Sequence, residues 1–191
     1  MTAPAALAGL LWLAVAAAAQ AAQAAPAVAI DPAHTELGFE VRTRYGQRLS
    51  GHFPVFRGQL LALADGRRQV QLTIDARHAE VRGHPRYTRW LRSAEFFDVQ
   101  RHADIVFRSD PIPPGLGATG GRLGGELVLR GVHGVLALDV VPAACTRPGY
   151  DCPLSGRGTV SRAAFGMDGW QLAVSDRVTF VLHVRLTGAD S

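Results

Sequence analysis

Two cysteines are the residues of this 191-residue chain best suited to redox chemistry. Cys145 and Cys152 flank the segment TRPGYD, in which Pro148 and Gly149 favour a turn. A redox or metal-binding pair is an alternative, but the spacing is not C-x-x-C and no histidine is adjacent. The pattern therefore favours a disulfide across a short loop in an oxidising compartment, where it would contribute about 2 kcal/mol.

Seven histidines could ligate a metal or transfer protons. His78 and His84 are separated by six positions, and only folding would bring His102 near them. A metal site needs at least three convergent ligands, and the sequence has no HExxH or His-x-His pattern. We therefore expect no metal and no cofactor.

The segment GLGATG, residues 115–120, matches the dinucleotide-binding pattern G-x-G-x-x-G. A dinucleotide site needs a buried strand before this pattern and a helix after it, whereas PIPP precedes it and GRLGG follows it. We predict a flexible hairpin loop here instead. The serines lack a G-x-S-x-G turn, and the acids fall mostly on outward strand positions. We therefore assign no catalytic residue and expect that the protein is not an enzyme.

Residues 1–24 have the composition of a cleavable signal peptide. The first charged side chain is Asp31, and the apolar run before it is too short to cross a bilayer as a helix. Small-residue A-x-A sites close the run at residues 19–21 and 22–24. The sequence thus predicts export with cleavage and a mature domain over residues 25–191. A retained anchor or a disordered Ala-rich tail is the alternative.

All twenty basic residues are arginines, and the net charge is +4. The arginines are spread from Arg42 to Arg185 without a basic run, which favours a solvated surface and no nucleic-acid partner. Contact with an anionic membrane surface stays open as an alternative.

Alternation of apolar and polar residues dominates the rest of the chain. Leu37, Phe39 and Val41 share one face of a predicted strand, with Glu36 and Glu40 on the other. The same period recurs at 70–74, 105–107, 127–129, 136–140 and 178–186. Roughly eight such strands with one apolar face each predict an all-β domain, either a barrel or a sandwich.

Short turns should connect these strands. Asp65 and Gly66 give a strong two-residue hairpin signal, and residues 132–134 are also typical of a turn. One segment, GHPRYTRWLRS, predicts a short amphipathic helix that begins at Pro85. Phe96 and Phe97 follow this helix outside the strand alternation, so we expect both rings to face inward.

Several segments resemble the motifs of one family, in the right order along residues 29–186. They are IDPAHTELGFEVR (30–42), SGHFPVFRGQL (50–60), LRSAEFFDV (91–99), LVLRGVHGVLALDV (127–140), R-x-x-F-G (162–166) and VSDRVTFVLHVRL (174–186). They resemble the YceI family of polyisoprenoid-binding, lipocalin-like exported proteins. The chain departs from the family pattern around the helix, at residues 87–90 and at His102 and Ala103.

The resemblance implies an extended eight-stranded antiparallel lipocalin-like barrel with a short helix near its opening. It also implies a periplasmic protein that binds an isoprenoid quinone or polyprenyl phosphate in the barrel interior, as a monomer or homodimer. The residues expected to line the interior are Phe39, Val41, Phe53, Phe56, Leu72, Ile74, Trp90, Leu91, Phe96, Phe97, Ile105, Phe107, Leu127, Leu129, Phe165 and Phe180.

Two alternatives remain open at this point. A filled barrel would act as a structural or stress-related interaction module without a ligand. An enzyme on isoprenoid phosphates would use groups at the mouth such as Arg92 and His102.

Overall fold

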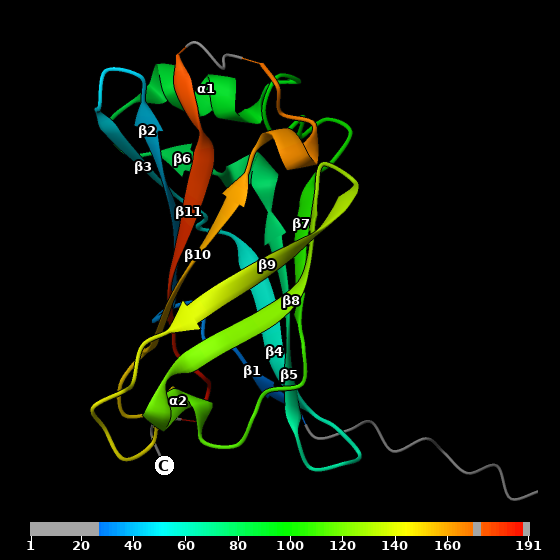
Figure 1. Ribbon diagram of the computed structural model, residues 1–191, viewed down its shortest axis with the longest axis vertical. Helices are drawn as coiled ribbons and strands as arrows, with labels where there is room; N and C mark the ends of the chain where they lie inside the picture. The colour runs from blue at the N-terminus through cyan, green and yellow to red at the C-terminus, as the bar shows by residue number, and fades with distance from the viewer. Residues whose placement is uncertain (1–26, 170–172, 189–191) are drawn as a thin grey trace, which may run out of the picture.

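The computed structural model describes residues 27–169 and 173–188, so the predicted signal peptide lies outside the described residues. Figure 1 shows an elongated β structure with the helix α1 (Pro85–Arg92) at one end and the short helix α2 (Leu116–Thr119) at the other. Two 3-10 turns, η1 (Ala76–His78) and η2 (Ala163–Phe165), complete the helical segments. The described chain is therefore built mainly of strands.

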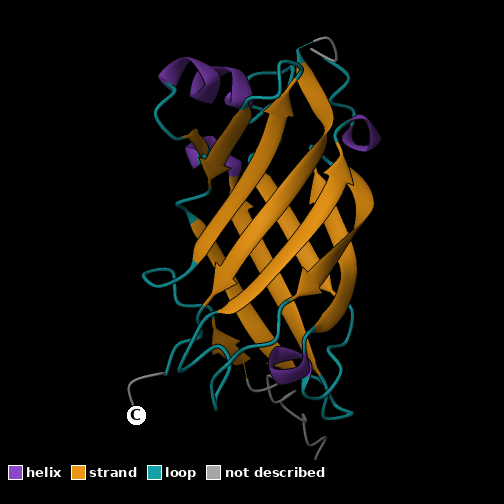
Figure 2. Ribbon diagram, turned by 60° about the vertical axis from the view of Figure 1, so that its left-hand side comes forward, coloured by secondary structure: helices purple, strands orange, loops and turns teal. Residues whose placement is uncertain are grey.

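All the described strands belong to one antiparallel sheet, which curls around a common interior (Figure 2). The hydrogen-bonded order is β1-β4-β5-β7-β8-β9-β10-β11-β2-β3-β6. The strands are β1 (Ala27–Ala29), β2 (Glu36–Thr43), β3 (Arg48–His52), β4 (Phe56–Ala62), β5 (Arg68–Asp75), β6 (Glu80–Val81), β7 (Asp104–Ser109), β8 (Gly121–Leu129), β9 (Val132–Val140), β10 (Leu154–Ser161) and β11 (Val174–Val184).

The all-β antiparallel fold is thus confirmed, but the sheet has eleven strands instead of the predicted eight. Part of the difference lies in β1 and β6, which have three and two residues. Period-two alternation is recognisable only over about four or more residues, so such short strands give no signal in the sequence.

One edge strand of the curled sheet, β1, is joined to the end of β11 at the α2 end. Ile30 follows β1 and forms an isolated bridge with Leu186, which follows β11. The Asp31 N–H donates to the Arg185 carbonyl at 2.9 Å, and the Thr187 N–H donates to the Ala29 carbonyl at 2.9 Å. These bonds satisfy backbone groups that an open edge would expose, and they close this end of the barrel.

Alternation correctly predicted the buried face of the long strands. In β2, Leu37 and Phe39 are buried, and in β7, Ile105 and Phe107 are buried. A hairpin around Asp65 and Gly66 is confirmed between β4 and β5. Its loop has three residues, 64–66, instead of two, because the Leu63 N–H donates to the Arg67 carbonyl at 2.7 Å. The turn expected at 132–134 is wrong, because β9 already begins at Val132.

The turn between β8 and β9 lies two residues earlier in the chain. Arg130 and Gly131 have φ values of 54° and 72°, the left-handed pair that a two-residue hairpin needs. Two-residue turns of this kind usually have Asn, Asp or Gly at the first position and Gly at the second. Here arginine occupies the first position, so the sequence shows only the glycine of the usual pair.

The helix α1 begins at Pro85, as predicted. Leu91 is buried against the barrel, Tyr87 is half-buried and Trp90 remains 38% exposed. Beyond the helix, Phe97 is buried, whereas Phe96 is only half-buried. The expectation that both rings face inward therefore holds fully for Phe97 alone.

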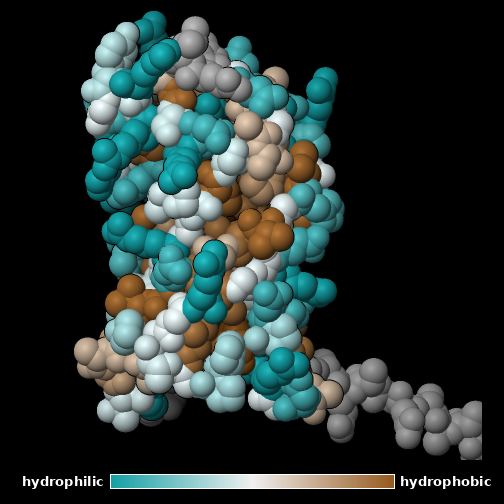
Figure 3. Space-filling model, in the orientation of Figure 1, coloured by the Kyte–Doolittle hydropathy of each residue, from teal (hydrophilic) through white to brown (hydrophobic). Residues whose placement is uncertain are grey.

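Hydrophilic side chains dominate the end of the molecule around α1 (Figure 3). In the same view, hydrophobic patches lie among hydrophilic ones over the outer face of β8, β9 and β10. Within the described ranges, no helix is long and apolar enough to span a membrane.

Candidate functional site

A cavity of about 430 Å³ occupies the α2 end of the barrel interior. Its wall is almost entirely aliphatic. Residues from eight strands, from four connections and from the segment after β11 contribute to it. The main lining side chains are Ile30, Leu37, Leu60, Val70, Leu72, Phe107, Ile112, Leu116, Leu123, Leu138, Val140, Pro148, Tyr150, Leu154, Leu182, Val184 and Leu186, with Arg67 and Arg68 the charged members.

The position of the cavity follows from the size of the inward-facing side chains along each strand. Leu37 and Leu182 are opposite each other in the β2–β11 ladder and both line the cavity. One level closer to α1, the same two strands carry the pair Phe39 and Phe180, both buried. The smaller leucine pair leaves space inside the barrel, whereas the phenylalanine pair fills it. The cavity therefore ends at Phe39 and Phe180.

Aromatic rings fill the barrel on the α1 side of that boundary. The centroid of the Phe53 ring lies 5.3 Å from that of Phe39, 6.0 Å from that of Phe97 and 6.4 Å from that of Phe180. Rings at these separations pack with favourable edge and offset contacts. This half of the interior is a closed core, and the hollow half opens away from it.

The segment GLGATG (115–120) packs over part of the cavity mouth. Gly115 and Gly120 have φ values of 79° and 69° and bracket the single turn of α2, whose Leu116 is buried against the cavity. Gly117 packs so closely on Leu154 and Pro148 that a Cβ would lie about 3 Å from both. The expectation of a plain hairpin loop was therefore wrong, because the glycines permit a compact turn that packs inward.

The predicted disulfide joins Cys145 to Cys152, which indicates an oxidising compartment outside the cytoplasm. The loop that it closes supplies Pro148 and Tyr150 to the cavity wall. The Leu186 N–H donates to the Gly149 carbonyl at 2.8 Å, which ties the loop to the end of the barrel. The disulfide thus fixes one side of the cavity mouth.

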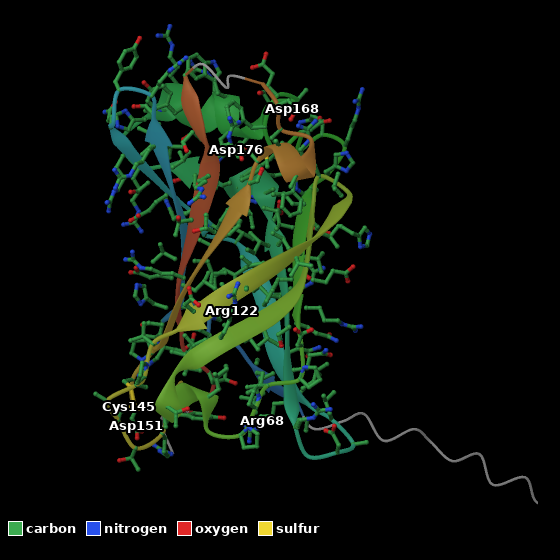
Figure 4. All side chains as sticks on the ribbon, in the orientation of Figure 1. Arg68, Arg122, Cys145, Asp151, Asp168 and Asp176 are labelled. Carbon is green, nitrogen blue, oxygen red and sulfur yellow. A yellow bond between two sulfur atoms is a disulfide. The ribbon has the colours of Figure 1, made fainter. Side chains whose placement is uncertain are left out.

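The charged side chains that line the cavity mouth are all positive. Arg67 is held by Asp65, with Nη2–Oδ2 at 2.6 Å, and these hydrogen bonds hold the pKa of the Asp65 carboxyl below its usual value. Arg68 lies beside it on the cavity rim (Figure 4). The described lining residues include no aspartate or glutamate. The mouth is therefore cationic while the interior is apolar.

The structure distributes the sixteen predicted lining residues over three environments. Leu72 and Phe107 line the cavity. Phe56, Val41, Phe96 and Trp90 are half-buried or partly exposed at the periphery. The others are buried in the packed core: Phe39, Phe53, Ile74, Leu91, Phe97, Ile105, Leu127, Leu129, Phe165 and Phe180.

Sequence reasoning missed most of the cavity wall. Leu37, Leu138 and Leu182 were recognised as inward residues, but nothing in the alternation separates them from inward residues of the packed half. The residues of α2, the disulfide loop and Arg68 belong to segments that were interpreted as surface. Arg68 does continue the period of Val70 and Leu72, and this is the one signal that could have placed it at the rim.

The histidines make local contacts in the described part of the chain. His78 Nδ1 lies 3.2 Å from Asp75 Oδ2, and His133 Nδ1 lies 2.7 Å from Glu126 Oε1. His183 shares a 2.9 Å hydrogen bond with Ser155. No group of three or more metal-ligating side chains gathers among the residues that the structure describes.

Comparison with known proteins identifies the relatives of this architecture. The model of the family described as "YceI-like domain" matches residues 29–186. No curated protein matches the sequence.

Solved structures share the fold at low sequence identity. BcnA from Burkholderia cenocepacia is 21% identical, with a TM-score of 0.65 over 81% of this chain and 98% of that one. A polyisoprenoid binding domain from Saccharophagus degradans, implicated in plant cell wall breakdown, is 16% identical, with a TM-score of 0.60 over 83% and 98% of the two chains. The YceI protein of Campylobacter jejuni is 17% identical, with a TM-score of 0.52 over 71% and 83%.

Proposed function

Because the chain belongs to the YceI-like domain family, we propose that it binds the apolar chain of an isoprenoid lipid in the cavity at the α2 end. The ligand is an isoprenoid quinone or a prenyl phosphate, and the protein sequesters or carries it without chemical change. The single observation that carries this proposal is the aliphatic cavity of about 430 Å³ that ends at the aromatic core.

The physical basis is the transfer of an insoluble chain from water into a dry cavity. Each buried CH₂ group contributes about 0.8 kcal/mol, so a short run of isoprene units suffices for useful affinity. A cavity of this size is typical of small-molecule sites, which combine apolar walls with a few polar groups at the mouth. The polyisoprenoid-binding relative with the same fold supports this choice of ligand class.

Export to the periplasm completes the proposal. Residues 1–24 act as the cleaved signal peptide, and residues 25–191 form the mature domain. The disulfide Cys145–Cys152 supports an oxidising destination. There the protein would shield a lipid chain between membranes.

A filled barrel acting as a structural or stress-related module is the second candidate. The aromatic packing around Phe53 favours it, because half of the interior is already core. This candidate predicts that the remaining cavity has no specific ligand.

Lipid extraction separates the two candidates. The protein is purified from its native periplasm without detergent, and bound lipids are identified by mass spectrometry. We expect one isoprenoid lipid per protein, and binding of added prenyl quinone or prenyl phosphate by the delipidated protein. Absence of both co-purified lipid and binding would contradict the carrier function and favour the filled module.

A further inference from the structure

Arg68 is the outermost residue of an inward-facing column of β5. Residues two apart in a strand share a face, so Arg68 lies on the same face as Val70 and Leu72, which line the cavity. Ile112 forms an isolated antiparallel β-bridge with Arg68 and also lines the cavity. The Arg68 side chain thus belongs to the wall, although the residue is exposed to solvent at the rim.

The two neighbouring arginines differ in their charge partners. Arg67 donates from Nε to Asp65 Oδ2 at 2.7 Å, so its charge is already matched. Within the described ranges, no carboxylate lies within 4 Å of the Arg68 guanidinium. Arg68 therefore supplies an unmatched positive charge where the apolar wall meets water.

A second polar group at the mouth comes from the loop that the disulfide closes. Tyr150 lines the cavity, and its hydroxyl forms no hydrogen bond with the described residues. That hydroxyl is not buried, because no buried polar side-chain atom of the described chain lacks a partner. By contrast, the hydroxyl of Ser155, another lining residue, is engaged by His183 at 2.9 Å. Tyr150 can therefore still donate to a ligand at the mouth.

We infer that the ligand is an amphiphile with an anionic, oxygen-bearing head group, which Arg68 binds at the cavity mouth. This inference rests on the proposed function and selects within it. A phosphate or carboxylate forms charge-assisted hydrogen bonds with a guanidinium, whereas a neutral quinone or alcohol offers a much weaker acceptor. The chain occupies the aliphatic cavity, and the head group stays in water beside Arg68.

The test compares ligands that share a chain and differ in the head group. Farnesyl phosphate and farnesol are titrated into the delipidated protein by calorimetry. We expect farnesyl phosphate to bind about tenfold more tightly, the effect of one charge-assisted hydrogen bond in a partly exposed site. The difference should shrink as salt is raised, because the pair is accessible to ions.

Variants test whether Arg68 causes the difference in affinity between farnesyl phosphate and farnesol. Arg68→Gln should remove the preference for farnesyl phosphate and leave farnesol binding unchanged, and Arg68→Lys should restore part of it. Arg122→Gln is the matched control, because it removes the same charge from an exposed outward position of β8 next to the lining residue Leu123 (Figure 4). Circular dichroism of each variant shows that the barrel remains folded.

Other outcomes overturn the inference in distinguishable ways. Equal binding of farnesyl phosphate and farnesol, or no effect of Arg68→Gln, rejects the anionic head group but leaves the proposed function standing. Failure of every chain to bind rejects the proposed function itself. Inorganic phosphate that binds as tightly as farnesyl phosphate would show a site for the free anion. Palmitate, tested in parallel, distinguishes a carboxylate head group from a phosphate.

Discussion

The guanidinium carbon of Arg162 lies 5.5 Å from the centre of the Phe96 ring. Arg162 belongs to the R-x-x-F-G segment and Phe96 to the LRSAEFFDV segment, so two distant motifs meet at one contact. The ring covers a guanidinium that is itself buried. The half-exposure of Phe96 is therefore explained by its partner, because this ring lies over a cation while Phe97 enters the aromatic core.

The two adjacent phenylalanines should differ in their contribution to stability. Phe97→Ala removes a buried ring from contacts with Phe39 and Phe53, and we expect a loss of about 3 kcal/mol or more. Phe96→Ala removes partial burial and one cation–π contact, and we expect about 1.5 kcal/mol. Urea denaturation of both variants measures the difference. Equal losses would contradict the distinct environments of the two rings.

Arg162 should be among the most sensitive polar positions. Its Nε donates to the Ser175 carbonyl at 3.0 Å, and its Nη atoms donate to the carbonyls of Met167, Gly169 and Val174 at 3.2 to 3.3 Å. Burial lowers the pKa of this guanidinium, with Asp176 and Asp168 opposing the shift. We expect Arg162→Ala to cost about 3 kcal/mol or more in urea denaturation, because several carbonyl oxygens lose their donor.

A matched exposed arginine controls for charge. Arg177 is exposed near the same loop, and Arg177→Ala should change stability by less than about 0.5 kcal/mol. Arg162→Lys should recover only part of the loss, because an ammonium group lacks the planar set of donors. Full recovery with lysine would show that charge alone matters at position 162.

The sequence predicted the faces of the strands but not the division of the interior. Leu72 and Ile74 are both aliphatic and in phase on β5, yet only Leu72 lines the cavity. The cavity ends where Phe39 and Phe180 on other strands replace the pair Leu37 and Leu182. Such a comparison across the barrel needs the register of distant strands, which a single sequence does not contain.

Rim residues escaped prediction for a different reason. The charge of Arg68 suggests a surface residue although its phase on β5 is inward. The glycines of GLGATG suggest a loop although they allow α2 to fold over the cavity. The disulfide and the helix start at Pro85 were predicted because each depends on residues close together in the chain.

Filling the cavity should abolish lipid binding without unfolding the barrel. Leu182→Trp adds a large ring to the wall next to Leu37, where the cavity has room for it. We expect loss of farnesyl phosphate and farnesol binding by calorimetry, with a cooperative melting transition retained. Val135→Trp is the control, because Val135 is 81% exposed on the outer face. Undiminished binding in Leu182→Trp would show that the chain lies elsewhere.

Loss of the disulfide should affect both stability and the mouth of the cavity. Replacing Cys145 and Cys152 together by alanine frees the loop that carries Pro148 and Tyr150, and we expect a loss of about 2 kcal/mol. Lipid affinity should fall severalfold, because the ligand must then order the wall. Reduction of the wild-type protein should reproduce both effects, and the double variant should be insensitive to reductant.

Acid should weaken the protein through Asp75. Its carboxylate accepts from Arg77 Nε at 2.9 Å and from Nη2 at 2.7 Å, and these bonds lower the pKa of Asp75 to about 2. A carboxyl whose pKa is depressed by folding contributes stability above its unfolded pKa of 3.8, and the contribution is lost as the pH falls toward 2. We therefore expect the wild-type melting temperature to fall more steeply between pH 4 and pH 2 than that of Asp75→Asn. Asp139→Asn, at an exposed position without an ion pair in the described chain, should keep the wild-type slope. Parallel curves for wild type and Asp75→Asn would contradict the role of this pair.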